Sequence, residues 1–123
     1  YEIAQCLVGS EMCIRDRVYT GTHDNVTTEG WRQSASPEDV HYACRYLRCL
    51  PEDLTEAMIC ACLASVSDMA IIPMADWLGL GEEAHLNSPG KLGGNWSWRA
   101  ADGFDTAALA KRILAECAVY CRT

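Results

Sequence analysis

Basic residues are scarce in this 123-residue chain. Ten lysines and arginines stand against 17 aspartates and glutamates, which gives a formal net charge of −7. No basic run is longer than Lys111-Arg112, whereas nucleic-acid-binding proteins cluster positive charge on one face. Long apolar runs are also missing, since none approaches the ~20 residues of a membrane-spanning helix. We therefore expect no nucleic-acid partner and no membrane partner.

Cysteine pairs of the metal-binding kind are missing too, although the chain has eight cysteines. No Cys-x-x-Cys pair occurs, and no histidine lies at zinc-site spacing from a pair. Most of the cysteines fall in helix-like stretches rich in Ala, Leu, Ile and Tyr. This placement favours reduced cysteines that pack as small core residues, with a disulfide framework and a metal site as the alternatives. It favours a cytoplasmic protein. No cofactor, metal ion or oligomeric state is implied.

Residues 1–17 differ from the rest of the chain, because they sustain neither a helical nor a strand period. The stretch from Cys6 to Arg17 resembles the peptide encoded when sequencing-adapter DNA is left on a read and translated. We therefore predict that residues 1–17 are a non-native segment that packs poorly and contributes no site residue. A genuine N-terminal strand is the alternative. The domain itself is expected over residues 18–123.

Strand-like and helix-like segments alternate from residue 18 onward. A short β-branched and aromatic run at 18–20 predicts a strand, and the apolar run at 69–73 predicts a strand buried on both faces. Helices are expected over 37–50, after a Ser36 cap, over 51–66, and from an Asp105 cap to about residue 120. Residues 76–81 read as a short turn or helix, and 86–103 as a loop.

This order of elements predicts an α/β fold. Two strands and about three helices cannot close a sheet by themselves. The pattern therefore favours the C-terminal portion of a (β/α)8 TIM-type barrel, present here in incomplete form.

Polar residues follow the first predicted strand. Residues 19–25 read Tyr-Thr-Gly-Thr-His-Asp-Asn, which places His23 and Asp24 just beyond the strand end. Barrel enzymes carry their catalytic groups at this end of their strands. A His-Asp pair is weak by itself, because Asp24 can instead cap a turn and His23 can be a structural histidine.

Aromatic and polar residues also mark the segment after the second strand. Trp96 and Trp98 flank Ser97, with Asn95 and Arg99 beside them. Flat rings cover the apolar face of a pyranose, while amide and guanidinium groups read its hydroxyls. This composition suits sugar binding, and the alternative is that both indoles pack a long loop onto the barrel.

Four motifs together carry a family resemblance. They are YTGTHDN at 19–25 with Gly-Trp at 30–31, AIIPM followed by D and LGLG at 70–81, LN-PG at 86–90, and GNW-WR at 94–99. In this order and spacing they resemble the C-terminal part of the 4-α-glucanotransferases, the amylomaltase or disproportionating-enzyme family of the α-amylase superfamily. The resemblance implies a barrel enzyme that transfers α-1,4-glucan segments to the 4-hydroxyl of an acceptor sugar. It implies retaining chemistry with a glucosyl-enzyme intermediate and maltooligosaccharide substrates.

The resemblance also implies roles for three residues. Asp24 matches the carboxylate that stabilises the transition state, while His23 and Asn87 match residues that contact the same sugar. The nucleophile and the acid/base precede residue 18 in this family, so a chain without them is expected to be inactive alone. The sequence departs from the family pattern, without touching a catalytic group, at Val26, Ala75, His85 and Ser97. The alternatives are another α-amylase-superfamily hydrolase or branching enzyme, and a non-catalytic glucan-binding module.

Overall fold

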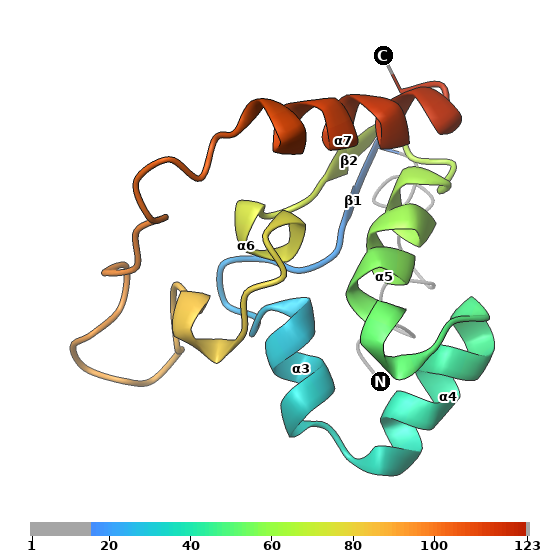
Figure 1. Cartoon of the computed structure of the whole chain (residues 1–123). Helices are drawn as coiled ribbons and strands as arrows, with labels where there is room; N and C mark the ends of the chain where they lie inside the picture. Colours follow the sequence, from blue (N-terminus) through green and yellow to red (C-terminus); the bar gives the residue numbers. More distant parts are fainter. Residues whose placement is uncertain (1–15, 123) are drawn as a thin grey trace.

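The computed structural model describes residues 16–122. The predicted non-native segment 1–17 therefore lies almost wholly outside the described residues. Figure 1 shows the two strands among the helices, with a long loop leading to the last helix. The strands are β1 (Arg17–Tyr19) and β2 (Met69–Ile71). The first lies one residue earlier than predicted, and the second ends two residues before its predicted end.

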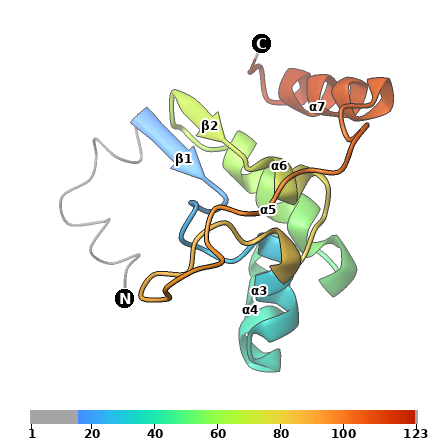
Figure 2. The same cartoon turned by 90° about the vertical axis from the view of Figure 1, so that its left-hand side faces the viewer.

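The two strands lie side by side and run parallel, as the sequence predicts for an α/β fold. Arg17 pairs with Met69, Val18 with Ala70 and Tyr19 with Ile71. Figure 2 shows both arrows pointing the same way, so their carboxyl ends and the loops that follow them meet at one edge. Within residues 16–122 each strand has a partner on one side only.

Helices form the crossover between the strands, and three further helices follow the second strand up to residue 122. The crossover holds α3 (Thr28–Ser34), α4 (Pro37–Leu47), the 3₁₀ helix η1 (Pro51–Asp53) and α5 (Leu54–Leu63). After β2 come α6 (Met74–Trp77), the 3₁₀ helix η2 (Glu82–Ala84) and α7 (Ala107–Val119). Residues 86–103 contain no helix or strand, as predicted.

Helix ends follow local chemistry. The Ser36 hydroxyl accepts a hydrogen bond from the Asp39 N–H and so caps α4, and Pro37 occupies the first turn, both as predicted. The same helix ends at Leu47, three residues before the predicted end, because Arg48 adopts a left-handed φ of 58°. The cap of α7 is Thr106, whose side chain accepts from the Leu109 N–H, so the prediction of Asp105 as the cap was wrong by one residue.

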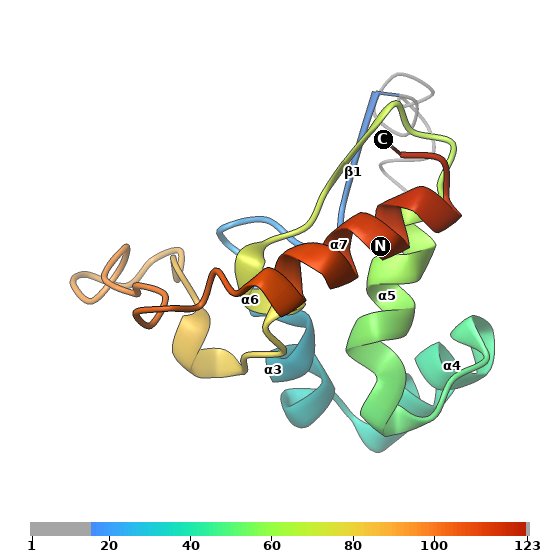
Figure 3. The same ribbon diagram turned by 45° about the horizontal axis from the view of Figure 1, so that its top comes forward.

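The core lies between α5, α6 and α7. Its buried side chains are Ile59, Leu63 and Trp77. Ala70 of β2 and Ile72 just after it pack on them. From α7 and its C-cap come Leu109, Ile113, Cys117 and Tyr120. Figure 3 shows α7 lying across α5. This packing fixes α6, and with it the segment that follows β2.

Three expectations about burial or structure were wrong. The apolar strand β2 is covered on one face only, since Met69 is 50% and Ile71 38% exposed while Ala70 faces the core. The helix predicted over 51–66 ends at Leu63, so Val66 lies beyond α5 and is exposed. The sequence analysis predicts no helix around Thr28, but the structure has α3 there, whose Thr27 cap accepts from the Gly30 N–H.

No helix among the described residues is long and apolar enough to cross a membrane. The six cysteines in the described part of the chain are all free thiols. Cys44 and Cys62 are buried, as expected for small core residues, whereas Cys121 is exposed.

Candidate functional site

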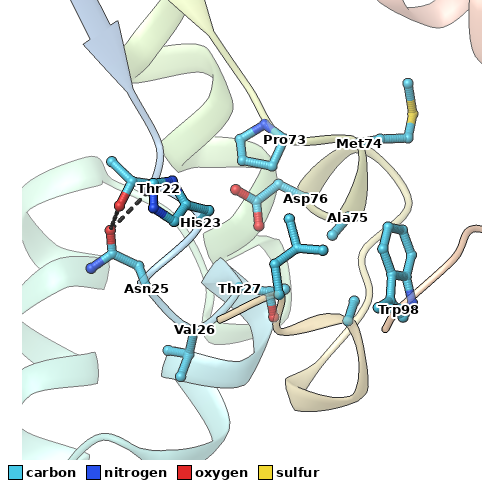
Figure 4. Close-up of a pocket in the computed structure, with 13 residues that line it drawn as sticks. Thr22, His23, Asn25, Val26, Thr27, Pro73, Met74, Ala75, Asp76 and Trp98 are labelled. Carbon is cyan, nitrogen blue, oxygen red and sulfur yellow. Dashed lines mark hydrogen bonds between the residues drawn. The ribbon is translucent and has the colours of Figure 1, made fainter. Parts of the chain in front are cut away.

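A pocket opens at the carboxyl ends of the two strands. Its volume is about 280 Å³, and its walls come from the loop after β1 and from α6, with the 84–98 region closing one side. Figure 4 shows His23 and Trp98 on opposite sides of this space, with the Asp76 carboxylate between them. The sequence places its candidate groups at this strand edge, and the structure puts a cavity there.

The three predicted site residues lie together. Asn87 donates its side-chain N–H to Oδ1 of Asp24 over 2.5 Å, and its backbone N–H donates to the His23 carbonyl over 3.1 Å. Nε2 of His23 lies 3.3 Å from the same Oδ1. The loops that follow two neighbouring strands therefore meet at one carboxylate.

This cluster is open to solvent. The side chain of His23 is 53% exposed and that of Asp24 is 45% exposed. His23 lines the pocket, whereas Asp24 and Asn87 are not part of its wall and lie beside it through their contacts with His23. An exposed carboxylate held by an amide and faced by an imidazole can accept hydrogen bonds from ligand hydroxyls.

A tight turn presents His23 and Asp24. The Asn25 N–H donates to the Thr22 carbonyl over 3.1 Å. In return, the Asn25 Oδ1 accepts from both the N–H and the hydroxyl of Thr22 at 2.8 Å. His23 and Asp24 are the central residues of this turn, so their backbone is fixed from both sides.

Trp96 and Trp98 both belong to the site. The Trp96 ring lies 5.0 Å from the His23 ring between centroids, tilted by 35°. Its backbone has a left-handed φ of 62°, and its N–H donates to the Leu86 carbonyl. Trp98 lines the pocket itself. The sequence prediction named these indoles as sugar-binding candidates or as loop packing, and Trp96 packs on a site residue while remaining 53% exposed.

The sequence prediction missed two site residues. His85 places Nε2 3.3 Å from the Asp24 carbonyl oxygen, and only 13% of its side chain is exposed. Asp76 lines the pocket, is 3% exposed and accepts hydrogen bonds from Thr20 and Thr28. The available signal for Asp76 was a lone acid directly after an apolar strand. For His85 it was only proximity to Asn87 along the chain.

A second group of polar side chains lies away from the pocket, between α5 and α7. Single ligand atoms of Glu56, Cys60 and Glu116 lie within 4.8 Å of one another. Burial raises the pKa of the Cys60 thiol, so this group favours the protonated form, which is a poor metal ligand. Glu56 is also ion-paired with Arg112. These properties do not favour a metal centre there.

Comparison with known proteins identifies relatives of the chain. The model of a family described as 4-alpha-glucanotransferase matches residues 11–105. A 4-alpha-glucanotransferase of Synechocystis sp. is 46% identical over 83 residues, which are 67% of this chain and 16% of that protein. A chloroplastic/amyloplastic 4-alpha-glucanotransferase of Solanum tuberosum is 40% identical over 109 residues, covering 85% of this chain and 19% of that protein.

A solved structure is similar as well. It is an amylomaltase from Streptococcus agalactiae in complex with acarbose, with a TM-score of 0.80 and 33% sequence identity. The match covers 86% of this chain and 22% of that chain. The chain thus spans about a sixth to a fifth of the length of its relatives. The family match begins inside residues 1–17, and the boundary of the segment predicted to be non-native stays a prediction.

Proposed function

Because this chain belongs to the 4-alpha-glucanotransferase family, we propose that it forms the C-terminal part of a (β/α)8 barrel enzyme. That enzyme transfers α-1,4-glucan segments to the 4-hydroxyl of an acceptor sugar. The observation that carries the proposal is the meeting of His23, Asp24 and Asn87 at the carboxyl ends of two parallel strands. Barrel enzymes place their active sites at this end of the barrel.

The proposed partners are maltooligosaccharides and longer α-1,4-glucans. The similar streptococcal amylomaltase was solved in complex with acarbose, which supports a sugar-like ligand for the complete enzyme. The largely apolar pocket wall with Trp98 on one side suits the face of a pyranose ring, and the polar cluster beside it suits the hydroxyls.

In this proposal Asp24 acts on the transition state rather than on ground-state binding. A retaining transfer uses a nucleophile and an acid/base, both supplied by other parts of the enzyme. As the glycosidic bond breaks, positive charge grows at the anomeric carbon. The Asp24 carboxylate stabilises that charge and holds hydroxyls of the distorting sugar, and such bonds strengthen as the charge develops.

The neighbours of Asp24 support this role by fixing its orientation before substrate arrives. Asn87 donates a hydrogen bond to Oδ1 of Asp24, and the His23 ring lies beside the same oxygen. Oδ2 has no hydrogen bond within residues 16–122, which leaves it for a sugar hydroxyl. A charge that is already oriented needs no reorganisation during the reaction, and this preorganisation is a main source of catalysis. His23 and Asn87 are proposed to contact the same sugar through their remaining polar atoms.

The cytoplasm is the proposed location. The free thiols of the described cysteines favour a reducing compartment. The Solanum tuberosum relative, by contrast, carries chloroplastic/amyloplastic in its name.

Incubation of the complete enzyme with maltotriose and ¹⁴C-glucose tests the proposal. A glucanotransferase yields glucose together with longer maltodextrins, and the label enters them with an intact α-1,4 linkage. A hydrolase of the α-amylase superfamily yields glucose and maltose without labelled longer products. A non-catalytic glucan-binding module retains maltodextrin on an affinity gel and yields no products. Either of the last two outcomes contradicts the proposed transfer.

A further inference from the structure

The geometry points to Asp76 as a positioning residue that sets the place of His23 and Asp24 by clamping both ends of their loop. This inference rests on the proposed function. Oδ2 of Asp76 accepts a hydrogen bond from the Thr20 hydroxyl over 2.5 Å. Oδ1 accepts from the Thr28 backbone N–H over 2.9 Å. Thr20 directly follows β1 and Thr28 begins α3, so one carboxylate joins the two ends of the loop that carries the site.

The carboxylate is built into the interior. Asp76 is 3% exposed, and no lysine, arginine or histidine nitrogen within residues 16–122 lies at salt-bridge distance from it. A buried carboxylate without a cation depends on its hydrogen-bond donors. The Thr28 N–H equally needs an acceptor, because the first N–H groups of a helix have no partner within the helix. Each side of the contact therefore holds the other in place.

The clamp is anchored to the core. Asp76 lies on α6, where its N–H donates to the Pro73 carbonyl over 3.0 Å. Its chain neighbour Trp77 belongs to the core with Ile59 and Leu63. The packed side chains of the core, and not the loop's own backbone, therefore fix the position of the loop after β1.

Between its clamped ends the loop has few degrees of freedom left. The turn at 22–25 closes through the hydrogen bonds between Thr22 and Asn25. Figure 4 shows the Asp76 carboxylate directed toward the space between His23 and Thr27. Releasing the clamp would let the turn shift as a unit, which would move the Asp24 carboxylate away from the reacting sugar without removing it.

Two substitutions at position 76 separate hydrogen bonding from charge. Asp76→Asn keeps an acceptor for the Thr28 N–H and gives Thr20 a donor, because a hydroxyl group can also accept. Asp76→Ala removes both bonds. In the complete enzyme we expect Asp76→Asn to keep kcat within about threefold of the unsubstituted enzyme. We expect Asp76→Ala to lower kcat by about 30-fold or more with KM changed less than about threefold, as for a misplaced catalytic group.

A double-mutant cycle with Asp24→Asn distinguishes positioning from general stability. If Asp76 acts through Asp24, Asp76→Ala lowers kcat by less than about threefold in the Asp24→Asn background. An equal loss in both backgrounds overturns the inference, as does an Asp76→Asn enzyme that is as slow as Asp76→Ala. Should Asp76→Ala fail to fold, Thr20→Val and Thr20→Ser replace it. We expect Thr20→Val to lower kcat by about tenfold and Thr20→Ser to restore it. Equal kcat values for the two Thr20 variants overturn the inference.

The activity of the unsubstituted enzyme distinguishes failure of the proposed function from failure of the positioning role. If it makes no longer maltodextrins from maltotriose, the proposed function fails. If it makes them and the Asp76 series shows no kcat effect, only the positioning role fails.

Discussion

Asn87 donates its side-chain N–H to Oδ1 of Asp24 over 2.5 Å, although 63 positions separate the two residues. The contact exists because β1 and β2 are adjacent and parallel, so the loops after them meet at one edge. It joins the residue proposed to stabilise the transition state to a residue proposed to contact the same sugar. Substitutions of either residue in the complete enzyme test these two roles.

Asp24→Asn is expected to lower kcat by about 100-fold or more, because a carboxylate that stabilises developing charge supplies ~3 kcal/mol. The amide is close in shape and still accepts from Asn87, so KM is expected to change little. Steady-state kinetics of maltotriose disproportionation measure both constants. Asp102→Asn, at an exposed loop position, is the charge-matched control. A variant that keeps more than a tenth of the original kcat, a ~1.4 kcal/mol loss, rules out the role.

Substitutions of Asn87 are expected to rank in a set order. Asn87→Ala removes the donor to Asp24, and kcat falls by about tenfold, since a hydrogen bond to a charged group is worth ~1.5 kcal/mol or more. Asn87→Asp places a second carboxylate against Oδ1, and like charges at that distance oppose ionisation of both. Its kcat at neutral pH is expected to lie below that of Asn87→Ala. Equal rates for the Asp variant and the unsubstituted enzyme would show that the contact has no part in catalysis.

Glu29 is expected to make stability depend on pH. A hydrogen bond from the Arg32 guanidinium lowers the pKa of Glu29 against the opposing effect of burial, with a smaller contribution from Gln33. A carboxyl whose pKa is lower in the folded than in the unfolded protein stabilises the fold above its ordinary pKa. That stabilisation is lost as pH falls through the lowered value.

The test compares melting temperatures of Glu29→Gln and the unsubstituted enzyme from pH 7 to pH 3. The unsubstituted enzyme is expected to melt higher at pH 7, with the gap closing toward pH 3. Glu38→Gln, at an exposed position in the first turn of α4, is the control and is expected to show a smaller gap. A gap of constant size over the whole range would contradict the assignment.

Ile59 is expected to be a main contributor to stability. It is fully buried and contacts Leu63 and Trp77 in the core. Ile59→Val is expected to lower the free energy of unfolding by about 1 kcal/mol and Ile59→Ala by about 2–5 kcal/mol. Urea unfolding of the complete enzyme measures both. Leu114→Ala is the control, since Leu114 is 64% exposed on α7 and its truncation is expected to stay within about 0.5 kcal/mol.

The 123-residue chain expressed alone is expected to be inactive and unstable. Tyr19, Met69 and Ile71 on the two strands are exposed, and each strand pairs on one side only within residues 16–122. Such edges and apolar faces need cover. Transfer also needs a nucleophile and an acid/base beside Asp24. Products from maltotriose above a blank, or a cooperative thermal transition of a monomer, would contradict this expectation.

The sequence predicts the elements best where local chemistry is strong. Ser36 and Pro37 predict the start of α4, because the residue preferences of a helix cap and first turn depend only on local sequence. The helix α3 is not predicted from the sequence because it is only seven residues long, with Gly30 in its middle and no apolar stripe. Gly30 is there for packing: an added Cβ would lie 3.0 Å from Thr27 Oγ1 and 3.2 Å from the Glu82 N atom. Close approach of two segments leaves no periodic trace in a sequence.

The site divides in the same way. His23 and Asp24 are predictable as residues that directly follow a strand, whereas the choice of Asn87 and the roles of all three residues come from the family resemblance. Asp76 and His85 are not predictable, because they act on a hydroxyl, a backbone N–H and a backbone carbonyl of a distant loop. Such partners have no residue-type signature. The overestimated burial of β2 has a related cause, since an apolar run does not say how many of its faces are covered.

The pairing of β1 with β2 sets the order in which the site assembles during synthesis. Arg17 pairs with Met69, 52 positions later, so β1 leaves the ribosome long before its partner. Helices such as α4 and α5 form from local contacts at once, whereas distant parallel pairing waits for the whole crossover. Until β2 emerges, β1 has an unpaired edge, and Asp24 has no Asn87 beside it. We therefore expect an interval during synthesis in which β1 is unpaired and the proposed sugar site has not yet formed.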